Sequence, residues 1–203
     1  GIPVVHRGQL LAELVGSYRT VAVAGAHGKS TTTALIAQTL AADGLDPLVA
    51  LGAEVEALGG NARPGKGPYA VVESDESDGS FLWLKPHIAV ITNIDDEHLD
   101  YFRSRFEIRD AYVSFASRVT PQGTVVGCAD DAGVLQALRA SGRRNLTYGL
   151  SEKAAVRAEQ VELRGGESRY RCTRDGRTLG RVTLRVPGLH NVRNALAALA
   201  CGI

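Results

Sequence analysis

The stretch VAVAGAHGKSTTTALIAQTL, from Val21 to Leu40, limits the possible folds more than any other part of the chain. It begins with four apolar residues and continues through the turn GAHGKS. A run rich in Thr, Ala and Leu follows, and it continues beyond Leu40 as far as Gly44. Glycine at the start and near the end of the turn permits backbone conformations that other residues avoid. The stretch therefore predicts a buried strand that turns directly into a helix.

A strand, a glycine-containing turn and a helix in this order can bind phosphate. Backbone N–H groups of the turn approach the phosphate oxygens, and the helix N-terminus adds a favourable partial charge. In such a loop Lys29 reaches the terminal phosphates of a nucleotide, and the Ser30 hydroxyl ligates Mg²⁺. We expect the nucleotide to contact the residues of this loop, which are Gly25, Ala26, His27, Gly28, Lys29, Ser30 and Thr31.

The loop departs from the common pattern G-x-x-x-x-G-K-[ST] at one position. That pattern requires glycine at position 23, and the chain has Val23. We therefore expect a loop that is tighter than, or shaped differently from, that of the common kinases and GTPases. The alternative is a glycine-containing turn with an incidental Lys-Ser pair.

Short runs rich in Val and Ile recur along the chain, each bounded by glycine or polar residues: Val21 to Ala24, Leu48 to Leu51, Tyr69 to Val72, Ile88 to Thr92 and Thr124 to Val126. Strands that are apolar throughout, rather than alternating, favour a parallel sheet with helices on both faces. Residues 35–40 and 108–119 between them have helical spacing. The predicted fold class is α/β, with a mostly parallel P-loop-type sheet flanked by helices.

The pattern changes to alternation after about Ser151. The segments AVRAEQVELR, SRYRCTR and RVTLRV are separated by RGGE and RDGR, which are typical of hairpin turns. We predict a small antiparallel ribbon, about residues 153–187, attached to the main sheet. A last helix is expected to begin near His190 or Asn191.

Acidic residues follow two of the predicted strands, in VVESDESDGSF and VITNIDDEHLDYF. The carboxyl ends of parallel strands share one edge of the sheet with the phosphate loop, so Glu73, Asp75, Asp95, Asp96 and His98 are predicted to converge near Lys29. Carboxylates there would suit Mg²⁺, which prefers oxygen ligands. The alternative for each acid is a helix cap or a solvated side chain.

A third candidate is the segment PGLHNVRNALAAL near the end of the chain. Asn191 and Asn194 lie three residues apart on one helical face, and an amide both donates and accepts hydrogen bonds, as the reading of an adenine edge requires. An N-cap asparagine followed by a core-packed helix explains the residues equally well.

Composition bounds the remaining possibilities. The 203 residues are 44% hydrophobic and 22% charged, with a formal net charge of +1, which suits one globular domain with no field that attracts nucleic acid or a membrane. The three cysteines form no CxxC pair, so neither a disulfide framework nor a zinc site is indicated. No apolar run reaches about 18 residues, so we expect a soluble, cytoplasmic protein without a membrane or nucleic-acid partner.

Five motifs together resemble the central ATP-binding domain of the Mur ligase family: GAHGKSTTT, GGNAR, ESDESDGSFL, TNIDDEHLD and PGLHNVRNALAA. They occur in the family's order and cover nearly the whole chain. The resemblance accounts for Val23, since the family's phosphate loop has the shorter form G-x-x-G-K-[ST]. It implies an interdomain linker or helix over residues 1–18 and the central domain over 19–203. The family's N-terminal UDP-binding and C-terminal domains are expected to lie outside this chain.

The resemblance also implies roles for individual residues. Three are expected to act in catalysis: Lys29, Glu73 and His98. Magnesium ligands are expected at Ser30, Glu73 and His98. The nucleotide is expected to contact, besides the phosphate loop, Asn93, His190, Asn191 and Asn194. The sugar substrate is expected to face Asn61, Arg63 and Ser77.

The implied activity is ATP-dependent amide-bond formation in peptidoglycan precursor synthesis, with ATP and Mg²⁺ as cofactors. The motifs most resemble those of the member that adds L-alanine to UDP-N-acetylmuramate. Its lactyl carboxylate attacks the γ-phosphate of ATP, and the amine of L-alanine then displaces phosphate from the acyl phosphate. The chain alone, without its flanking domains, is expected to bind Mg-ATP weakly and to make no amide bond.

Three alternatives remain open from the sequence. A sister ligase, such as the recycling enzyme that joins a whole peptide to UDP-N-acetylmuramate, shares these motifs. A P-loop kinase or regulatory ATPase would be expected to carry glycine at position 23. A non-catalytic module would bind nucleotide without substrate-dependent hydrolysis.

Overall fold

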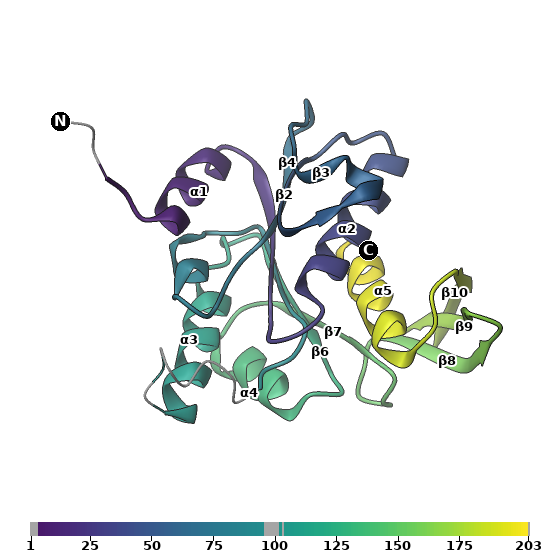
Figure 1. Ribbon diagram of the computed structural model, residues 1–203. Coiled ribbons are helices and arrows are strands. Elements are labelled where there is room, and N and C mark those ends of the chain that lie inside the picture. Colours follow the sequence, from purple (N-terminus) through teal and green to yellow (C-terminus); the bar gives the residue numbers. More distant parts are fainter. Residues whose placement is uncertain (1–3, 96–101, 103, 203) are drawn as a thin grey trace.

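A computed structural model describes residues 4–95, 102 and 104–202. In this part of the chain ten strands form a single sheet in the order β10-β9-β8-β7-β6-β5-β1-β4-β2-β3 (Figure 1). The strands are β1 (Arg19–Ala24), β2 (Leu48–Val55), β3 (Gly60–Arg63), β4 (Tyr69–Glu73), β5 (Ile88–Ile91), β6 (Thr124–Cys128), β7 (Asn145–Gly149), β8 (Val156–Arg164), β9 (Glu167–Arg174) and β10 (Arg177–Leu184).

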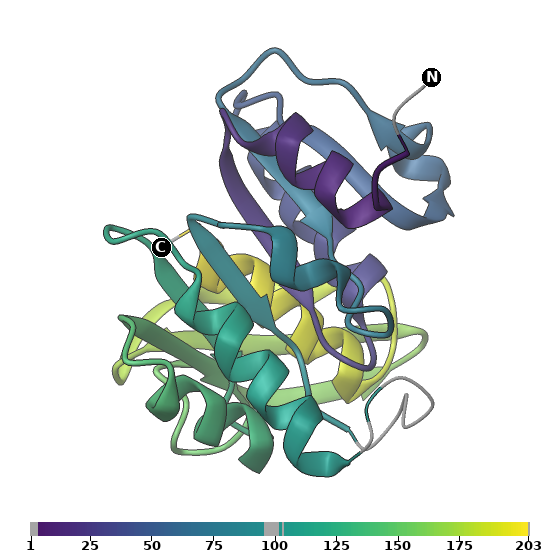
Figure 2. The ribbon, with the colours of Figure 1, turned by 90° about the vertical axis from the view of Figure 1, so that its left-hand side faces the viewer.

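Helices cover both faces of this sheet. They are α1 (Arg7–Val15), α2 (Lys29–Ala42), α3 (Arg105–Ser117), α4 (Ala132–Ala140), α5 (Leu189–Cys201) and the short 3-10 helices η1 (Glu56–Leu58) and η2 (Ser80–Trp83). The helices α1, α3 and α4 share one apolar cluster with η2, whereas α2 and α5 share the other. Figure 2 looks onto the first of these faces, with α5 behind the sheet.

Strand β1 shows why the sheet has two buried faces. Ala22 and Ala24 belong to the cluster under α1, α3 and α4, whereas Val21 and Val23 belong to the cluster under α2 and α5. Successive residues of a strand point to opposite faces, so a strand covered on both sides must be apolar at every position. β1 lies between β4 and β5 and runs parallel to both. The predicted α/β class and the mostly parallel sheet are confirmed.

The five strands predicted from apolar runs are all present, and the sheet contains two more that were not predicted. β3 and β7 are too polar for such a run, because their sequences are GNAR and NLTYG. They become strands by pairing, β3 with β2 and β7 with β6 and β8. Helix α4 was also missed, although Asp131 is a clear N-cap whose carboxylate accepts the N–H of Val134 at 2.8 Å.

The antiparallel ribbon is confirmed as β8, β9 and β10, and in Figure 1 it extends to one side of the molecule. Its two turns fall where the sequence predicted them, with positive φ at Gly165 and Gly166 in the first and at Asp175 and Gly176 in the second. Positive φ at both central residues is typical of tight hairpins. The ribbon continues the main sheet because β8 pairs with β7 in parallel.

Helix α1 lies within the predicted linker or helix of residues 1–18, and it packs against η2. Gly8 permits this close contact, because an added Cβ would lie 2.9 Å from the Ser80 Cα. Two ion pairs flank the contact, Arg7 with Asp75 at 3.8 Å and His6 with Asp78 at 3.9 Å. α1 therefore packs directly against the loop that follows β4.

Replacing Gly8 by alanine is expected to lower the free energy of unfolding by up to about 2 kcal/mol. Overpacking against the Ser80 backbone destabilises the fold by about 1–3 kcal/mol. The better helix propensity of alanine offsets about 1 kcal/mol of this destabilisation. The matched control is Gly180→Ala, since an added Cβ there meets open space. Urea denaturation of the full-length protein measures both variants, and equal stability of the two would contradict the proposed contact.

None of the helices in the described ranges is long and apolar enough to cross a membrane. All three cysteines are free thiols. Burial raises the pKa of Cys128 to about 11 and that of Cys201 to about 12, so both stay protonated at neutral pH.

Candidate nucleotide-binding site

The predicted phosphate loop connects β1 to α2 as expected, although the helix begins at Lys29, two residues earlier than the sequence suggested. Gly25 has φ 138° and Gly28 has φ 81°. Gly28 is the N-cap of α2, and no side chain caps this helix. The first N–H groups of α2 therefore lack a side-chain acceptor, which is the arrangement that favours an anion.

The loop is held in place by the residues that follow β5. The Asn93 amide accepts the His27 N–H at 2.9 Å and donates to the His27 carbonyl at 2.9 Å. The Thr92 hydroxyl donates to the same carbonyl at 2.7 Å. Asn93 was predicted to contact the nucleotide, and in this structure it fixes the loop that would do so. The part played by Thr92 was missed, although it ends one of the predicted strands.

Lys29 makes two short contacts. Its ammonium donates to the Gly25 carbonyl at 2.8 Å and to the Glu76 carboxylate at 2.8 Å. Glu76 was not among the predicted site residues, although it lies in the acidic motif that supplied Glu73 and Asp75. The motif contains four acids, and the sequence gives no signal for which of them faces inward.

A cavity of about 700 Å³ adjoins one side of the phosphate loop. It is lined by residues from four parts of the chain: the loop residues His27, Gly28 and Thr31, the segment 92–95, the carboxyl ends of β6 and β7, and the first turns of α5. His190, Asn191 and Asn194 all reach it, so the structure brings these three predicted residues together. Asn194 lies close to the loop, since its Oδ1 would be 2.7 Å from a Cβ at Gly28.

Asn191 has a second contact that bears on its role. Its amide donates to the Pro187 carbonyl at 2.7 Å, four residues earlier. It does not cap the helix through its side chain, because α5 begins at Leu189 with Gly188 as the N-cap. The helix therefore begins one residue before the predicted start.

Asp130 and Arg193 form an ion pair on the wall of the same cavity, and neither was predicted. Arg193 Nε lies 2.7 Å from the Asp130 carboxylate, which also accepts the N–H groups of Leu150 and Ser151. Burial raises the pKa of the Asp130 carboxyl, but the hydrogen bonds that it accepts outweigh burial, so its pKa lies below the usual value of 3.8. This carboxylate joins the loop after β7 to α5.

The variant Asp130→Asn is expected to lose about 1–3 kcal/mol of unfolding free energy at pH 7, the usual range for hydrogen bonds to a charged group. Because the folded pKa lies below the unfolded one, the stabilisation is complete above the unfolded pKa and is lost as the pH falls through the folded pKa. The difference between wild type and variant should therefore shrink below about pH 4. Thermal melts across pH test this, with the exposed Asp110→Asn as control, and a difference independent of pH would contradict the assignment.

A second cavity, of about 530 Å³, adjoins the other side of the loop. It lies between α1 and the carboxyl ends of β2 and β4, and Ser30, Glu73 and Asp75 are among its lining residues. The Glu73 carboxylate accepts the Gly52 N–H at 2.9 Å. Of the predicted acids, Glu73 and Asp75 therefore lie on this side of the loop. Asp95 lines the first cavity, where its carboxylate is 4.0 Å from His27.

Two of the three predicted magnesium ligands line this second cavity. The Ser30 hydroxyl and the Glu73 carboxylate share one wall, and both are donors that suit Mg²⁺. In the described part of the chain no group of three or more His, Cys, Asp or Glu residues could hold a metal by itself. His98 and Asp96, which were predicted to complete the acidic cluster, lie outside the described residues.

The residues predicted to face a sugar substrate are less closely grouped. Arg63 pairs with Asp46 at 2.5 Å toward the amino-terminal end of β2, at the opposite end of the sheet from the phosphate loop. Asn61 is exposed in β3. The backbone N–H of Ser77 donates to Asp75, which places Ser77 in the acidic loop. The structure thus brings Ser77, but not Arg63, near the second cavity.

Comparison with known proteins identifies the family. The model of the Mur ligase middle domain matches residues 23–202. A UDP-N-acetylmuramate–L-alanine ligase from Desulfatibacillum aliphaticivorans is 46% identical over 203 residues, which make up 100% of this chain and 44% of that protein. One from Bordetella avium is 49% identical over 98% of this chain and 44% of its own length. The chain therefore spans less than half the length of these curated relatives.

A comparison with solved structures points to the same family. The UDP-N-acetylmuramate-alanine ligase from Thermotoga maritima has a TM-score of 0.84 and 30% identity, over 96% of this chain and 44% of that one. The middle-domain match covers most of the chain, and it includes the phosphate loop, the acidic loop and α5. The chain belongs to the Mur ligase family, in which it corresponds to the middle domain.

Proposed function

We propose that this chain is the central ATP-binding domain, residues 19–203, of an enzyme that joins L-alanine to UDP-N-acetylmuramate. Residues 1–18 would then connect it to a UDP-binding domain, and a further domain would complete the site for the amine. The observation that carries the proposal is the position of the phosphate loop between two cavities. Gly28 and Thr31 line the larger one, and Ser30 lines the smaller.

A ligase that couples ATP to amide formation needs such an arrangement. The nucleotide base and ribose would occupy the larger cavity, beside His190, Asn191 and Asn194. The terminal phosphates would lie over the loop, near Lys29, and the acceptor carboxylate would approach from the smaller cavity. The carboxylate attacks the γ-phosphate in line, ADP leaves, and the amine then displaces phosphate from the acyl phosphate.

The main task for the protein is to bring two anions together. The transferred phosphoryl group and the attacking carboxylate repel each other, so positioning and charge neutralisation dominate. Lys29 supplies one positive charge from the loop. Magnesium would be held by Ser30 and Glu73, with His98 as a third proposed ligand, and it would neutralise charge on the phosphates.

The choice of L-alanine rests on the relatives. Curated relatives at 42–49% identity are named UDP-N-acetylmuramate–L-alanine ligases. A sister enzyme fits the fold equally well. The UDP-N-acetylmuramate:L-alanyl-gamma-D-glutamyl-meso-diaminopimelate ligase from Neisseria meningitides has a TM-score of 0.87 at 27% identity and covers 100% of this chain and 66% of that one. The sequence identities favour L-alanine, and the use of ATP and a UDP-sugar is consistent with a cytoplasmic enzyme.

The test is phosphate release by the full-length protein with Mg-ATP and UDP-N-acetylmuramate. L-alanine, L-serine, glycine and the recycled peptide are added one at a time, and the amide product is identified by mass spectrometry. Release that L-alanine stimulates, with a matching product, is the expected result. Stimulation by the peptide alone would replace the proposal by the sister ligase. Release that is indifferent to the UDP-sugar would exclude a ligase and favour a general P-loop ATPase.

A further inference from the structure

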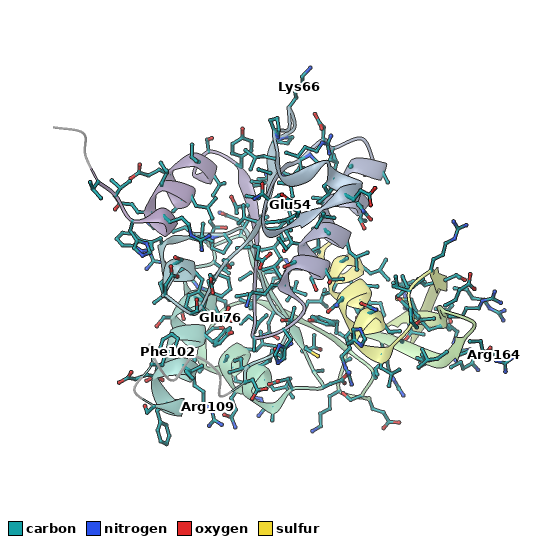
Figure 3. The ribbon with its side chains drawn as sticks, in the orientation of Figure 1. Glu54, Lys66, Glu76, Phe102, Arg109 and Arg164 are labelled. Atoms are coloured by element: carbon teal, nitrogen blue, oxygen red, sulfur yellow. The ribbon has the colours of Figure 1, made fainter. Side chains whose placement is uncertain are left out.

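Glu76 is a buried acid in direct contact with the lysine of the phosphate loop. Its carboxylate lies 2.8 Å from the Lys29 ammonium, and the two side chains are 3% and 15% exposed. Figure 3 labels Glu76, and it shows the side chains of Lys66 and Arg164 at the edge of the molecule. An acid with so little exposed surface needs a polar partner, and Lys29 is that partner.

The loop that carries Glu76 is held by its own hydrogen bonds. The Ser74 hydroxyl and N–H both donate to the Val23 carbonyl, which ties the start of the loop to β1. The Gly79 N–H donates to the Glu76 carbonyl at 3.1 Å, and the Phe81 N–H donates to the Asp75 carbonyl at 3.0 Å. Phe81 is fully buried beside α3. The backbone of the loop is therefore held by hydrogen bonds on both sides of Glu76.

A nucleotide would need the same cation. In the proposed function the terminal phosphates lie over the loop and interact with Lys29. They then compete with Glu76 for the ammonium, and the carboxylate repels each phosphate charge that comes close. The repulsion depends on charge and distance, so it is largest for the phosphates nearest Lys29 and small for a phosphate farther away.

We propose that Glu76 is the counter-ion of the phosphate-loop lysine in the nucleotide-free protein. In this role it holds the Lys29 ammonium in place, and it weakens the binding of nucleotides by an amount that increases with the number of phosphates. The inference rests on the proposed function, because it assumes that the loop binds a nucleoside triphosphate.

The test uses Glu76→Gln in the full-length protein. Glutamine has nearly the same size and can still accept the lysine hydrogen bond, so the change removes the charge and leaves the shape. Isothermal titration calorimetry gives dissociation constants for ATP, ADP and AMP. We expect the variant to bind ATP on the order of tenfold more tightly, as expected for the loss of one nearby like charge, and AMP within about twofold of wild type. The matched control is Glu162→Gln on the exposed ribbon, for which no nucleotide should change.

A further variant keeps the inference falsifiable. Glu76→Asp keeps the charge but withdraws it from Lys29, so its affinity for ATP should lie between those of wild type and Glu76→Gln. If Glu76→Gln does not fold, the ATP and AMP affinities of Glu76→Asp are compared with those of wild type instead.

The outcomes separate this inference from the proposed function. If the wild-type protein binds neither ATP nor ADP, the proposed function itself fails. If wild type binds ATP and Glu76→Gln changes ATP and AMP affinity equally, or weakens ATP binding, Glu76 has only a structural role and the counter-ion proposal is overturned.

Discussion

Replacing Lys29 by alanine in the full-length protein is expected to lower turnover by a factor of about 10² or more, the size of effect seen when one preorganised electrostatic group is removed. The ammonium is held at 2.8 Å from both the Gly25 carbonyl and the Glu76 carboxylate, so its position is set before any substrate binds. Alanine cannot neutralise charge on the transferred phosphoryl group. Single-turnover measurement of ADP formation checks the prediction without interference from product release.

This substitution needs a control for stability, because it leaves Glu76 buried without its cation. Removing one partner of a buried ion pair costs about 3–5 kcal/mol, which could unfold the protein and mimic a loss of catalysis. The double variant Lys29→Ala/Glu76→Gln removes both charges and should fold better while remaining as slow. Near-normal turnover in either folded variant would contradict the assignment of Lys29 to the phosphates.

The elements that the sequence predicted best are those in which one residue pattern allows only one structure. The apolar run at Val21 to Ala24 must be buried on both faces, and Gly25 and Gly28 adopt positive φ that few other residues tolerate. These local requirements predict the strand, the loop and the start of α2. The hairpins of the ribbon follow from glycine in the same way, at Gly166 and Gly176.

The contacts within the site depend on residues far apart in the chain, and the sequence alone does not determine them. Asn93 and His27 are 66 residues apart, and Lys29 and Glu76 are 47 apart, yet each pair is hydrogen-bonded. The sequence placed several acids in one short loop, but it does not say that Glu76 is the one that contacts Lys29. Arg63 was predicted to face the substrate, and the structure pairs it with Asp46.

The arrangement of the site also explains why the loop is held so firmly by its neighbours. Thr92 and Asn93 hold the His27 carbonyl on the side of the larger cavity. Glu76 holds Lys29 from the acidic loop, which is itself in contact with α1. A movement of α1 would therefore reach the phosphate-loop lysine through a single loop.

Replacing Gly25 by alanine is expected to lower the free energy of unfolding by roughly 2–5 kcal/mol and to weaken ATP binding by about 10²-fold, because strain in the backbone and a steric clash add at one position. Gly25 has φ 138°, and an added Cβ would lie 2.0 Å from the Thr92 hydroxyl and 3.0 Å from the Asn93 backbone. Either the phosphate loop or the segment after β5 must therefore move. The loop would contact the phosphates directly, and the segment after β5 positions the loop.

Gly44 provides the matched control, because it also has positive φ, at 77°, but an added Cβ there meets open space. Gly44→Ala should therefore show the backbone strain alone, about 1–3 kcal/mol, with unchanged affinity for ATP. Urea denaturation and calorimetric titration of both full-length variants separate the two contributions. If Gly25→Ala costs no more than Gly44→Ala and binds ATP normally, the loop does not depend on its contact with Thr92.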